Sequence, residues 1–169
     1  MSHIVKIALR FKVKQALDHA IQVASEGAER VDGYKFYDGT VASGLGIQFK
    51  DWQYKAVVDN DGAMIHDNYN GMWGKQSHLD KFCQEYTFEV ARSWAMERGY
   101  LVQDNGCILT MITPEGGSIV VTADGQVATS GFVGADCQQT TGTLEALMGE
   151  RQTEAVTEEY YLAPQHIQL

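Results

Sequence analysis

Residues 77–99 read SHLDKFCQEYTFEVARSWAMERG and predict the longest helix of the chain. Ser77 and Asp80 resemble a capping box at its start, with Asp80 in place of the usual glutamate. Gly99 is typical of a residue that ends a helix. The side chains expected on the inward face recur at intervals of three and four residues: Leu79, Phe82, Cys83, Tyr86, Val90 and Trp94.

The residues before this helix predict a strand, a shorter helix and further strands. From Val13 to Ala24 the apolar spacing is helical, and Gly27 is expected to end that helix as a left-handed cap. The glycine-rich stretch 33–49 predicts short strands and loops, and residues 54–58 predict one more strand. The first strand is expected where apolar side chains alternate with polar or small ones: Val5, Ile7, Leu9 and Phe11.

The residues after the long helix predict hairpins followed by a helix. Asn105-Gly106 is a strong signal for a tight turn between two strands, and residues 123–125, Ala-Asp-Gly, predict a second hairpin. Residues 135–148 have helical spacing, and Gly149 is expected to end that helix. The acidic and then apolar tail after Gly149 is assigned no element.

This order of elements predicts an α+β fold with a mostly antiparallel sheet and helices on one face. A ferredoxin-like arrangement is compatible with the order over residues 1–112. We expect an α+β domain over residues 1–110. A C-terminal ββα unit with an acidic tail, residues 111–169, is expected to pack on it.

Charge is distributed unevenly along a chain whose formal net charge is -9. Residues 1–98 contain 12 lysines and arginines and 13 acids, whereas residues 99–169 contain nine acids and one base, Arg151. An acidic surface repels phosphate backbones, so nucleic-acid binding is not expected. It suits a basic protein partner, although solvated acidic surfaces that aid solubility are more common.

Composition and cysteine usage are typical of a globular protein in a reducing compartment. The chain is 44% hydrophobic and 21% charged, and no apolar run approaches the roughly 20 residues that span a bilayer. The alternating start of the chain is typical of a strand and not of a signal peptide. The cysteines are odd in number and widely spaced, which predicts reduced thiols and a cytoplasmic location: Cys83, Cys107 and Cys137.

The stretch DNDGAMIHDNYNGMWG, residues 59–74, has the highest density of side chains that could bind a ligand or take part in catalysis. An EF-hand loop counted back from Gly62 would begin at Val57 and end at Asn68, and neither residue is the acidic ligand required there. His66 and His78 could share a zinc ion only if the chain folded back. We therefore predict a hairpin turn, a connection and a helix entry, with no metal.

Four residues of this stretch are the candidate binding residues: His66, Asp67, Tyr69 and Trp73. Trp73 stands among asparagines and glycines, which cannot cover a large ring. Two interpretations stay open: Trp73 fills the core beneath the loop, or it is exposed as a binding anchor. The core is favoured because most large aromatic side chains are mainly buried.

A second candidate lies at the start of the helix expected over residues 135–148. Gly131 and Gly134 precede that helix, whose free backbone N–H groups could hold a phosphate. Asp136 in the first turn already satisfies the helix dipole and repels phosphate, so a nucleotide is not favoured. Cys137 at a helix start could be reactive, but its spacing predicts an inward-facing side chain. No catalytic residue and no cofactor is predicted.

Two groups of residues carry family resemblances. The first comprises Met1-Ser2-His3, Asp61-Gly62, Tyr69, Trp73-Gly74 and Gly99-Tyr100. Through it the first part of the chain resembles a family of uncharacterised proteins encoded in red-algal plastids, cyanobacteria, other bacteria and phages. The second comprises Ile112, Pro114, Gly116, Gly131, Gly134, Cys137, Leu144, Gly149 and Glu159-Tyr160. Through it residues 111–162 resemble a second small uncharacterised family. Neither family has established catalytic residues, and the resemblance implies genes close to one another and to an AAA+ ATPase.

The hypothesis that we favour is a non-enzymatic binding or adaptor protein that works with an AAA+ ATPase or another protein machine. Homo-oligomers are compatible with it. A first alternative is a small-molecule or nucleotide site, binding or enzymatic, at residues 59–74. A second is a viral protein whose acidity blocks a basic host protein, with binding that would depend strongly on salt.

Overall fold

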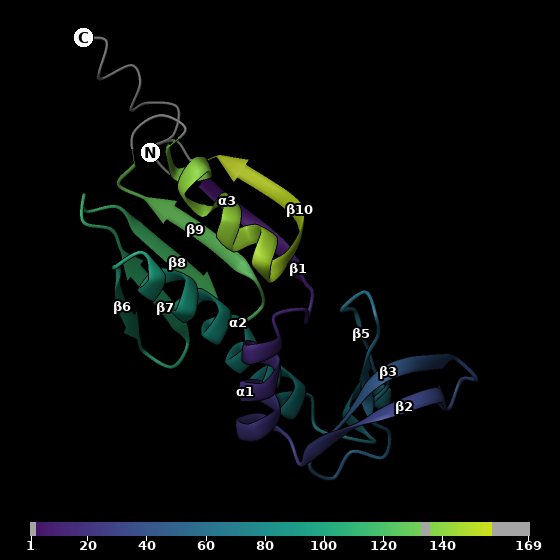
Figure 1. Cartoon of the computed structure of the whole chain (residues 1–169). Helices are drawn as coiled ribbons and strands as arrows, with labels where there is room; N and C mark the ends of the chain where they lie inside the picture. The colour runs from purple at the N-terminus through teal and green to yellow at the C-terminus, as the bar shows by residue number, and fades with distance from the viewer. Residues whose placement is uncertain (1–2, 133–135, 157–169) are drawn as a thin grey trace. The chain divides into compact units, whose positions relative to one another are not determined.

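The computed structural model describes residues 3–132 and 136–156. Within this part of the chain, six strands form one antiparallel sheet in the order β10-β1-β9-β8-β7-β6 (Figure 1). The expected α+β fold with a mostly antiparallel sheet is confirmed. The strands are β1 (His3–Leu9), β6 (Leu101–Asp104), β7 (Ile108–Ile112), β8 (Ser118–Thr122), β9 (Gln126–Ser130) and β10 (Gly149–Val156).

A second antiparallel sheet, also counted over the described residues, has the order β2-β3-β4-β5. Because the strands of residues 1–112 are divided between two sheets, they do not form the one sheet of a ferredoxin-like arrangement. The strands of the second sheet are β2 (Gly27–Lys35), β3 (Val41–Gln48), β4 (Ala56–Val58) and β5 (Met64–Ile65). The helices are α1 (Lys14–Ala24), α2 (Gln76–Glu97) and α3 (Asp136–Met148), with one 3-10 turn, η1 (Tyr69–Gly71).

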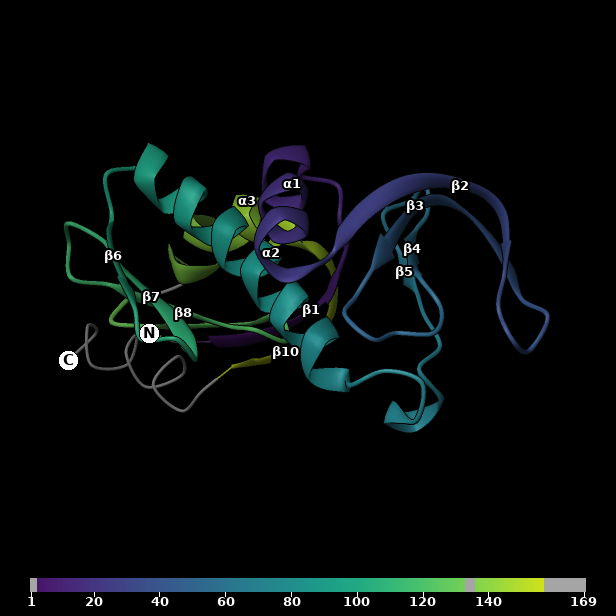
Figure 2. The same ribbon diagram turned by 90° about the horizontal axis from the view of Figure 1, so that it is seen from below.

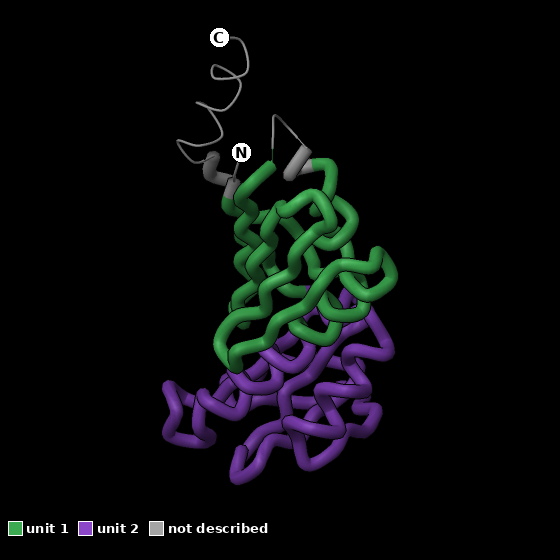
Figure 3. The backbone as a smooth tube through the Cα atoms, turned by 90° about the vertical axis from the view of Figure 1, so that its left-hand side faces the viewer, with its two compact units in different colours: residues 1–9, 87–169 green, residues 10–86 purple. Residues whose placement is uncertain are grey.

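The chain divides into two compact units, which Figure 3 shows in different colours. Unit 1 consists of residues 1–9 and 87–169, and unit 2 consists of residues 10–86. One boundary follows β1, because β1 pairs with β9 and β10 from the far end of the chain. The other boundary lies inside α2. These units differ from the expected division into residues 1–110 and 111–169.

Unit 1 buries one face of its sheet beneath helices. α3 and the second half of α2 lie on the same face (Figure 2). The Trp94 indole N–H donates to Thr143 Oγ1 over 2.9 Å, which joins the two helices. The Arg98 guanidinium lies 4.3 Å from the Trp94 ring centroid and covers it. The buried strand residues alternate in sequence, as a half-buried sheet requires: Val5, Ile7, Leu109, Met111, Ile119, Val121 and Val127.

Unit 2 has an aromatic core around the first half of α2. The Phe11 ring lies 5.8 Å from that of Phe82 and 4.7 Å from that of Tyr86, between centroids. Phe49 packs on Phe82 at 5.5 Å and on Trp52 at 5.0 Å. The Tyr86 hydroxyl donates to the Arg10 carbonyl over 2.8 Å and accepts from the Val13 N–H over 3.0 Å. These bonds satisfy a hydroxyl that would otherwise be buried at a cost.

Most local signals are confirmed, with two corrections at helix ends. Gly99 has a φ of 73° and ends α2, and Gly106 and Gly125 adopt the left-handed turns expected in the two hairpins. Gly27 does not cap α1, because Ser25 ends it in an extended conformation and its hydroxyl donates to the Ile21 carbonyl. α2 begins at Gln76, so Ser77 lies in its first turn and does not precede the helix.

The strand β10 was not predicted from the sequence. It begins at Gly149 and pairs with β1 from Leu9 to His3. Arg151 at its start donates to Glu145 Oε1 of α3 over 2.9 Å, and Glu145 is only 4% exposed. The Thr141 hydroxyl donates to the second oxygen of the same carboxylate over 3.0 Å. The ion pair therefore ties β10 to α3, whereas the acidic tail beyond residue 156 lies outside the described residues.

Replacing Arg151 with alanine should destabilise the protein by about 2–4 kcal/mol, because it leaves the buried Glu145 carboxylate without its cation. The free energy of unfolding, measured in urea, tests this. The matched control is Arg92→Ala, which breaks partly exposed ion pairs with Glu89 and Asp104. That variant should lose no more than about 1 kcal/mol. Equal losses in the two variants would contradict the buried role of Glu145.

Candidate functional site

The aspartates at the start of the central stretch form a turn. The Asp59 carboxylate accepts hydrogen bonds from the N–H groups of Asp61 and Ala63, over 2.9 and 3.0 Å. The Gly62 N–H donates to the Asp59 carbonyl, and Gly62 has a φ of 81°. The expected hairpin turn is thus confirmed between β4 and β5. Over the described residues, no three side chains of His, Cys, Asp or Glu gather as a metal site would require.

Residues 69–71, which follow β5, have an unusual left-handed backbone conformation. Tyr69, Asn70 and Gly71 have consecutive φ values of 47°, 53° and 90°. The Asp67 carboxylate accepts from the Tyr69 N–H, and the Asn68 carbonyl accepts from the N–H groups of Gly71 and Trp73. Left-handed conformations of residues other than glycine are strained by about 1 kcal/mol or more and persist where neighbours fix them. Asp67 and Asn68 therefore shape this loop.

Trp52 anchors the loop to the body of unit 2. Its buried indole N–H donates to the Lys75 carbonyl over 3.0 Å, and the Gln53 N–H donates to the Trp73 carbonyl over 2.8 Å. Gly74 lies so close to the Trp52 ring that an added Cβ would come within 2.5 Å of ring atoms. The position therefore requires glycine for close packing, not for a positive φ.

Three aromatic rings are in contact at the surface, and together with the exposed Met72 next to them in sequence we call them the aromatic surface: Tyr37, Tyr69, Met72 and Trp73. Tyr37, Tyr69 and Met72 are 69%, 51% and 75% exposed. The Trp73 ring stacks on Tyr69 at 4.7 Å, and Tyr37 meets it edge-on at 4.9 Å, between centroids. Trp73 is half-buried, and its ring centroid lies 5.7 Å from that of Tyr54. It is therefore neither a fully buried core residue nor a fully exposed anchor, the two interpretations that the sequence left open.

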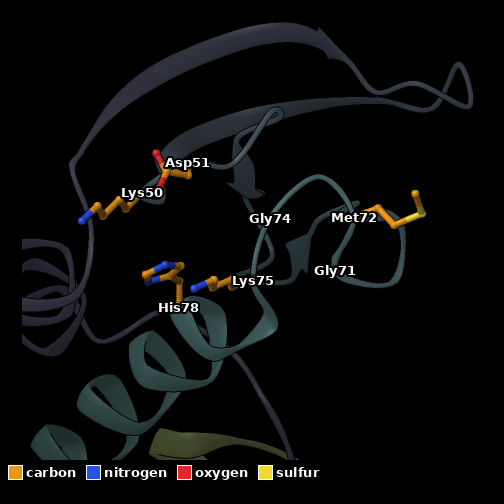
Figure 4. A pocket seen from close by; sticks show the side chains of 7 residues that line it. All are labelled: Lys50, Asp51, Gly71, Met72, Gly74, Lys75 and His78. Carbon is orange, nitrogen blue, oxygen red and sulfur yellow. The ribbon is translucent and has the colours of Figure 1, made fainter.

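A pocket of about 310 Å³ lies beside the aromatic surface in unit 2 (Figure 4). Lys75 and His78, at the start of α2, form one wall, and Lys50 and Asp51 form the opposite wall. Gly71, Met72 and Gly74 complete the lining, although the Met72 side chain points away from the other labelled side chains. Asp51 has a φ of 60° and so, like Tyr69 and Asn70, has a strained left-handed backbone.

His66 faces Trp52 and does not line this pocket. Its imidazole ring centroid lies 6.2 Å from that of Trp52. Partial loss of solvent lowers the pKa of His66, and the nearby Asp67 carboxylate opposes that change. The imidazole is therefore mainly neutral near pH 7. The candidates Tyr69 and Trp73 are brought together, whereas His66 and Asp67 act on the local structure.

The second candidate region is only partly described. Gly131 has a φ of 79° and lines a pocket of about 470 Å³ with Tyr100, Thr113, Glu115 and Phe132. Among the described residues that line this pocket, Glu115 alone is charged. Its negative charge disfavours binding of a phosphate. Gly134 and the side chain of Cys137 lie outside the described residues.

The thiol of Cys83 is unsuited to nucleophilic chemistry. Burial, with a smaller contribution from the nearby Asp80 carboxylate, raises the pKa of Cys83 to about 12. The predicted role as a small inward-facing side chain of α2 agrees with this environment. A thiol that stays protonated near neutral pH does not attack a substrate.

Sequence reasoning missed Tyr37, Lys50, Met72 and Lys75 as site residues. Tyr37 and Lys50 lie far before the central loop in sequence, and turns in the chain bring them to it. Lys50 and Tyr37 each stand beside an aspartate and a turn, which predicts only a surface position. Met72 and Lys75 flank Trp73-Gly74, so their proximity to that motif was the one available signal.

A protein-family model matches residues 118–161, and that family is described as a protein of unknown function (DUF2997). The match begins with β8 and includes α3 and β10. The expected resemblance of residues 111–162 to an uncharacterised family is confirmed over these residues. The resemblance of the first part of the chain and the association with an AAA+ ATPase stay predictions. No curated protein and no solved structure matches the chain.

Replacing Gly74 with alanine should destabilise unit 2 by about 1–3 kcal/mol, because the new methyl group must displace the Trp52 ring. Urea unfolding followed by tryptophan fluorescence measures this. The control is Gly142→Ala in α3, where an added Cβ meets nothing within 4 Å. That substitution should stabilise the protein by up to about 1 kcal/mol. If Gly74→Ala is neutral, Trp52 does not hold the loop as described.

Protonation of His66 should destabilise the folded chain. Its pKa is lowered on folding from the ordinary value of 6.5, so the unfolded chain binds the proton more readily. The contribution to stability is present above about pH 6.5 and is lost as pH falls towards the lower folded pKa. Urea unfolding between about pH 7 and pH 5 should show a smaller loss for His66→Gln than for the wild type. Identical pH profiles would show that His66 is not desolvated.

Proposed function

We propose that the protein is a non-enzymatic binding protein that docks another protein through the aromatic surface. The observation that carries this proposal is the exposure of Tyr37, Tyr69 and Met72 around the half-buried Trp73. Aromatic residues and methionine are enriched at protein interfaces, where rigid rings bury much area at little entropic cost.

The backbone beneath this surface supports the same function. The left-handed conformations of Tyr69 and Asn70 work against folding stability, and backbone N–H groups of the loop hold them by donating hydrogen bonds to Asp67 and Asn68. The consequence of this strain is a Tyr69 ring stacked on Trp73 at the surface. A loop that served only to connect β5 to α2 would not need that conformation.

The acidic latter part of the chain is a weaker candidate for docking. Several of its carboxylates are already paired: Asp104 with Arg92 at 2.8 Å, Asp124 with Lys6 at 2.8 Å, and Glu145 with Arg151 at 2.9 Å. Paired carboxylates attract a basic partner less strongly. For this reason the proposed docking site lies in unit 2 and not in residues 99–169.

An AAA+ ATPase is the partner that the family resemblance implies, and a cytoplasmic protein machine is the proposed setting. None of the helices in the described part of the chain has the length and apolar character needed to cross a membrane. Self-association is compatible with the same surface.

The second candidate function is small-molecule or nucleotide binding at the central loop. The observation that favours it is the pocket of about 310 Å³, a volume at the lower end for small ligands. A thermal-shift screen with nucleotides discriminates between the two functions. A ligand at a hundredfold excess over its Kd would stabilise the protein by about 2.7 kcal/mol.

The docking proposal is tested by capture from native cells with the protein at its normal level. Tyr69→Ala/Met72→Ala should reduce recovery of the partner by about tenfold or more, because such anchors contribute more than about 1 kcal/mol each. The matched control is Met96→Ala/Leu101→Ala, which removes two side chains of unit 1 that are each 67% exposed. Equal recovery by both double variants, with unchanged unfolding temperatures, would refute docking at the aromatic surface.

A further inference from the structure

The pocket beside the aromatic surface carries positive charge in a chain whose net charge is -9. Two lysines and a histidine line it, with Asp51 as the single acid of the lining. Apart from His78, the side chains of Lys50, Lys75 and Asp51 leave one net positive charge. That charge matches a single carboxylate better than the roughly two negative charges of a phosphate group.

The ammonium groups of the two lysines have no ion-pair partner among the residues that the structure describes. Neither Lys50 nor Lys75 lies within ion-pair distance of a described carboxylate, that of Asp51 included. Other lysines of the chain do pair, with nitrogen–oxygen distances of 3.4 Å or less: Lys6, Lys14, Lys55 and Lys81. The ammonium groups of the pocket are therefore available to a ligand.

Hydrogen bonds hold both walls of the pocket in place. The Gln48 side-chain amide donates to the carbonyls of Phe49 and Trp52, over 2.8 and 2.9 Å, and so closes the turn that carries Lys50 and Asp51. The bond from the Trp52 indole to the Lys75 carbonyl links that turn to the opposite wall. A site whose backbone is fixed before binding loses less conformational entropy when a ligand enters.

The pocket and the aromatic surface share Met72. Met72 belongs to the aromatic surface and also lines the pocket. One bound segment can therefore reach both places at once. An apolar side chain of that segment would contact Tyr69 and Trp73, while a neighbouring side chain enters the pocket.

We infer that the partner of the aromatic surface is a protein segment in which an acidic residue stands beside an apolar one. Its carboxylate accepts hydrogen bonds from Lys50 and Lys75 in the pocket, with His78 alongside, and its apolar neighbour packs on Tyr69 and Trp73. This inference rests on the proposed function and specifies the chemistry of the partner.

The capture experiment tests it with charge variants. Lys50→Gln/Lys75→Gln should reduce recovery of the partner by about tenfold and remove most of the dependence of recovery on salt between about 50 and 300 mM. The control is Lys14→Gln/Lys81→Gln, which removes the same charge from exposed ion pairs elsewhere in unit 2. This control should retain recovery.

A direct binding measurement uses the acetylated peptide Glu-Leu-Trp-Glu-Leu-Glu, a peptide with glutamine in place of each glutamate, and inorganic phosphate. In amide NMR spectra the acidic peptide should shift residues 50–52 and 71–78, and the glutamine peptide should not. Shifts with phosphate alone would show a pocket for a small free anion and would overturn the inference. An absence of shifts with all three probes would overturn it as well.

The two proposals fail in distinguishable ways. Suppose that Tyr69→Ala/Met72→Ala abolishes capture and Lys50→Gln/Lys75→Gln leaves it unchanged. The inference of an acidic residue in the partner segment is then wrong, and the proposal of docking at the aromatic surface stands. If neither double variant changes capture, the proposed function fails together with the inference.

Discussion

The packing of Trp52 against Gly74 is the constraint on which the candidate site depends. An indole that is buried needs a partner for its N–H group, and the Lys75 carbonyl supplies it. The absence of a side chain at residue 74 allows the ring to reach that carbonyl. This one contact sets where the chain leaves the loop and enters α2. The aromatic surface and the positions of Lys50 and Lys75 both follow from it.

The polar residues of the central stretch direct the backbone. The Asp59 and Asp67 carboxylates accept hydrogen bonds from N–H groups of residues that follow them. Asn68 holds the loop through its carbonyl, which accepts, and through its side-chain amide, which donates to Gln76. Carboxylates used in this way are not arranged around a common centre. The same bonds hold Tyr69 in a strained conformation, and so the loop exposes aromatic rings at a place where polar residues dominate the sequence.

In unit 1 the first and last strands of the described residues pair with each other. β1 lies between β9 and β10, so the first strand completes a sheet whose other members come from the second half of the chain. The buried ion pair between Glu145 and Arg151 adds a polar tie between α3 and β10. Arg151, the one base after residue 98, is thus part of the architecture, and the carboxylate it neutralises is not available to a partner.

Local chemistry determined what the sequence alone could predict. The turns at Gly62 and Gly106 and the end of α2 at Gly99 depend on residues within a few positions of each other, and the period of the apolar side chains identified the helices. The α+β class followed from their order. Tertiary structure alone decided that β10 pairs with β1, that the strands divide into two sheets, that Tyr37 meets Trp73, and that Lys50 and Lys75 line one pocket. These contacts join residues far apart in the chain, and their energies depend on packing and desolvation that no local pattern contains.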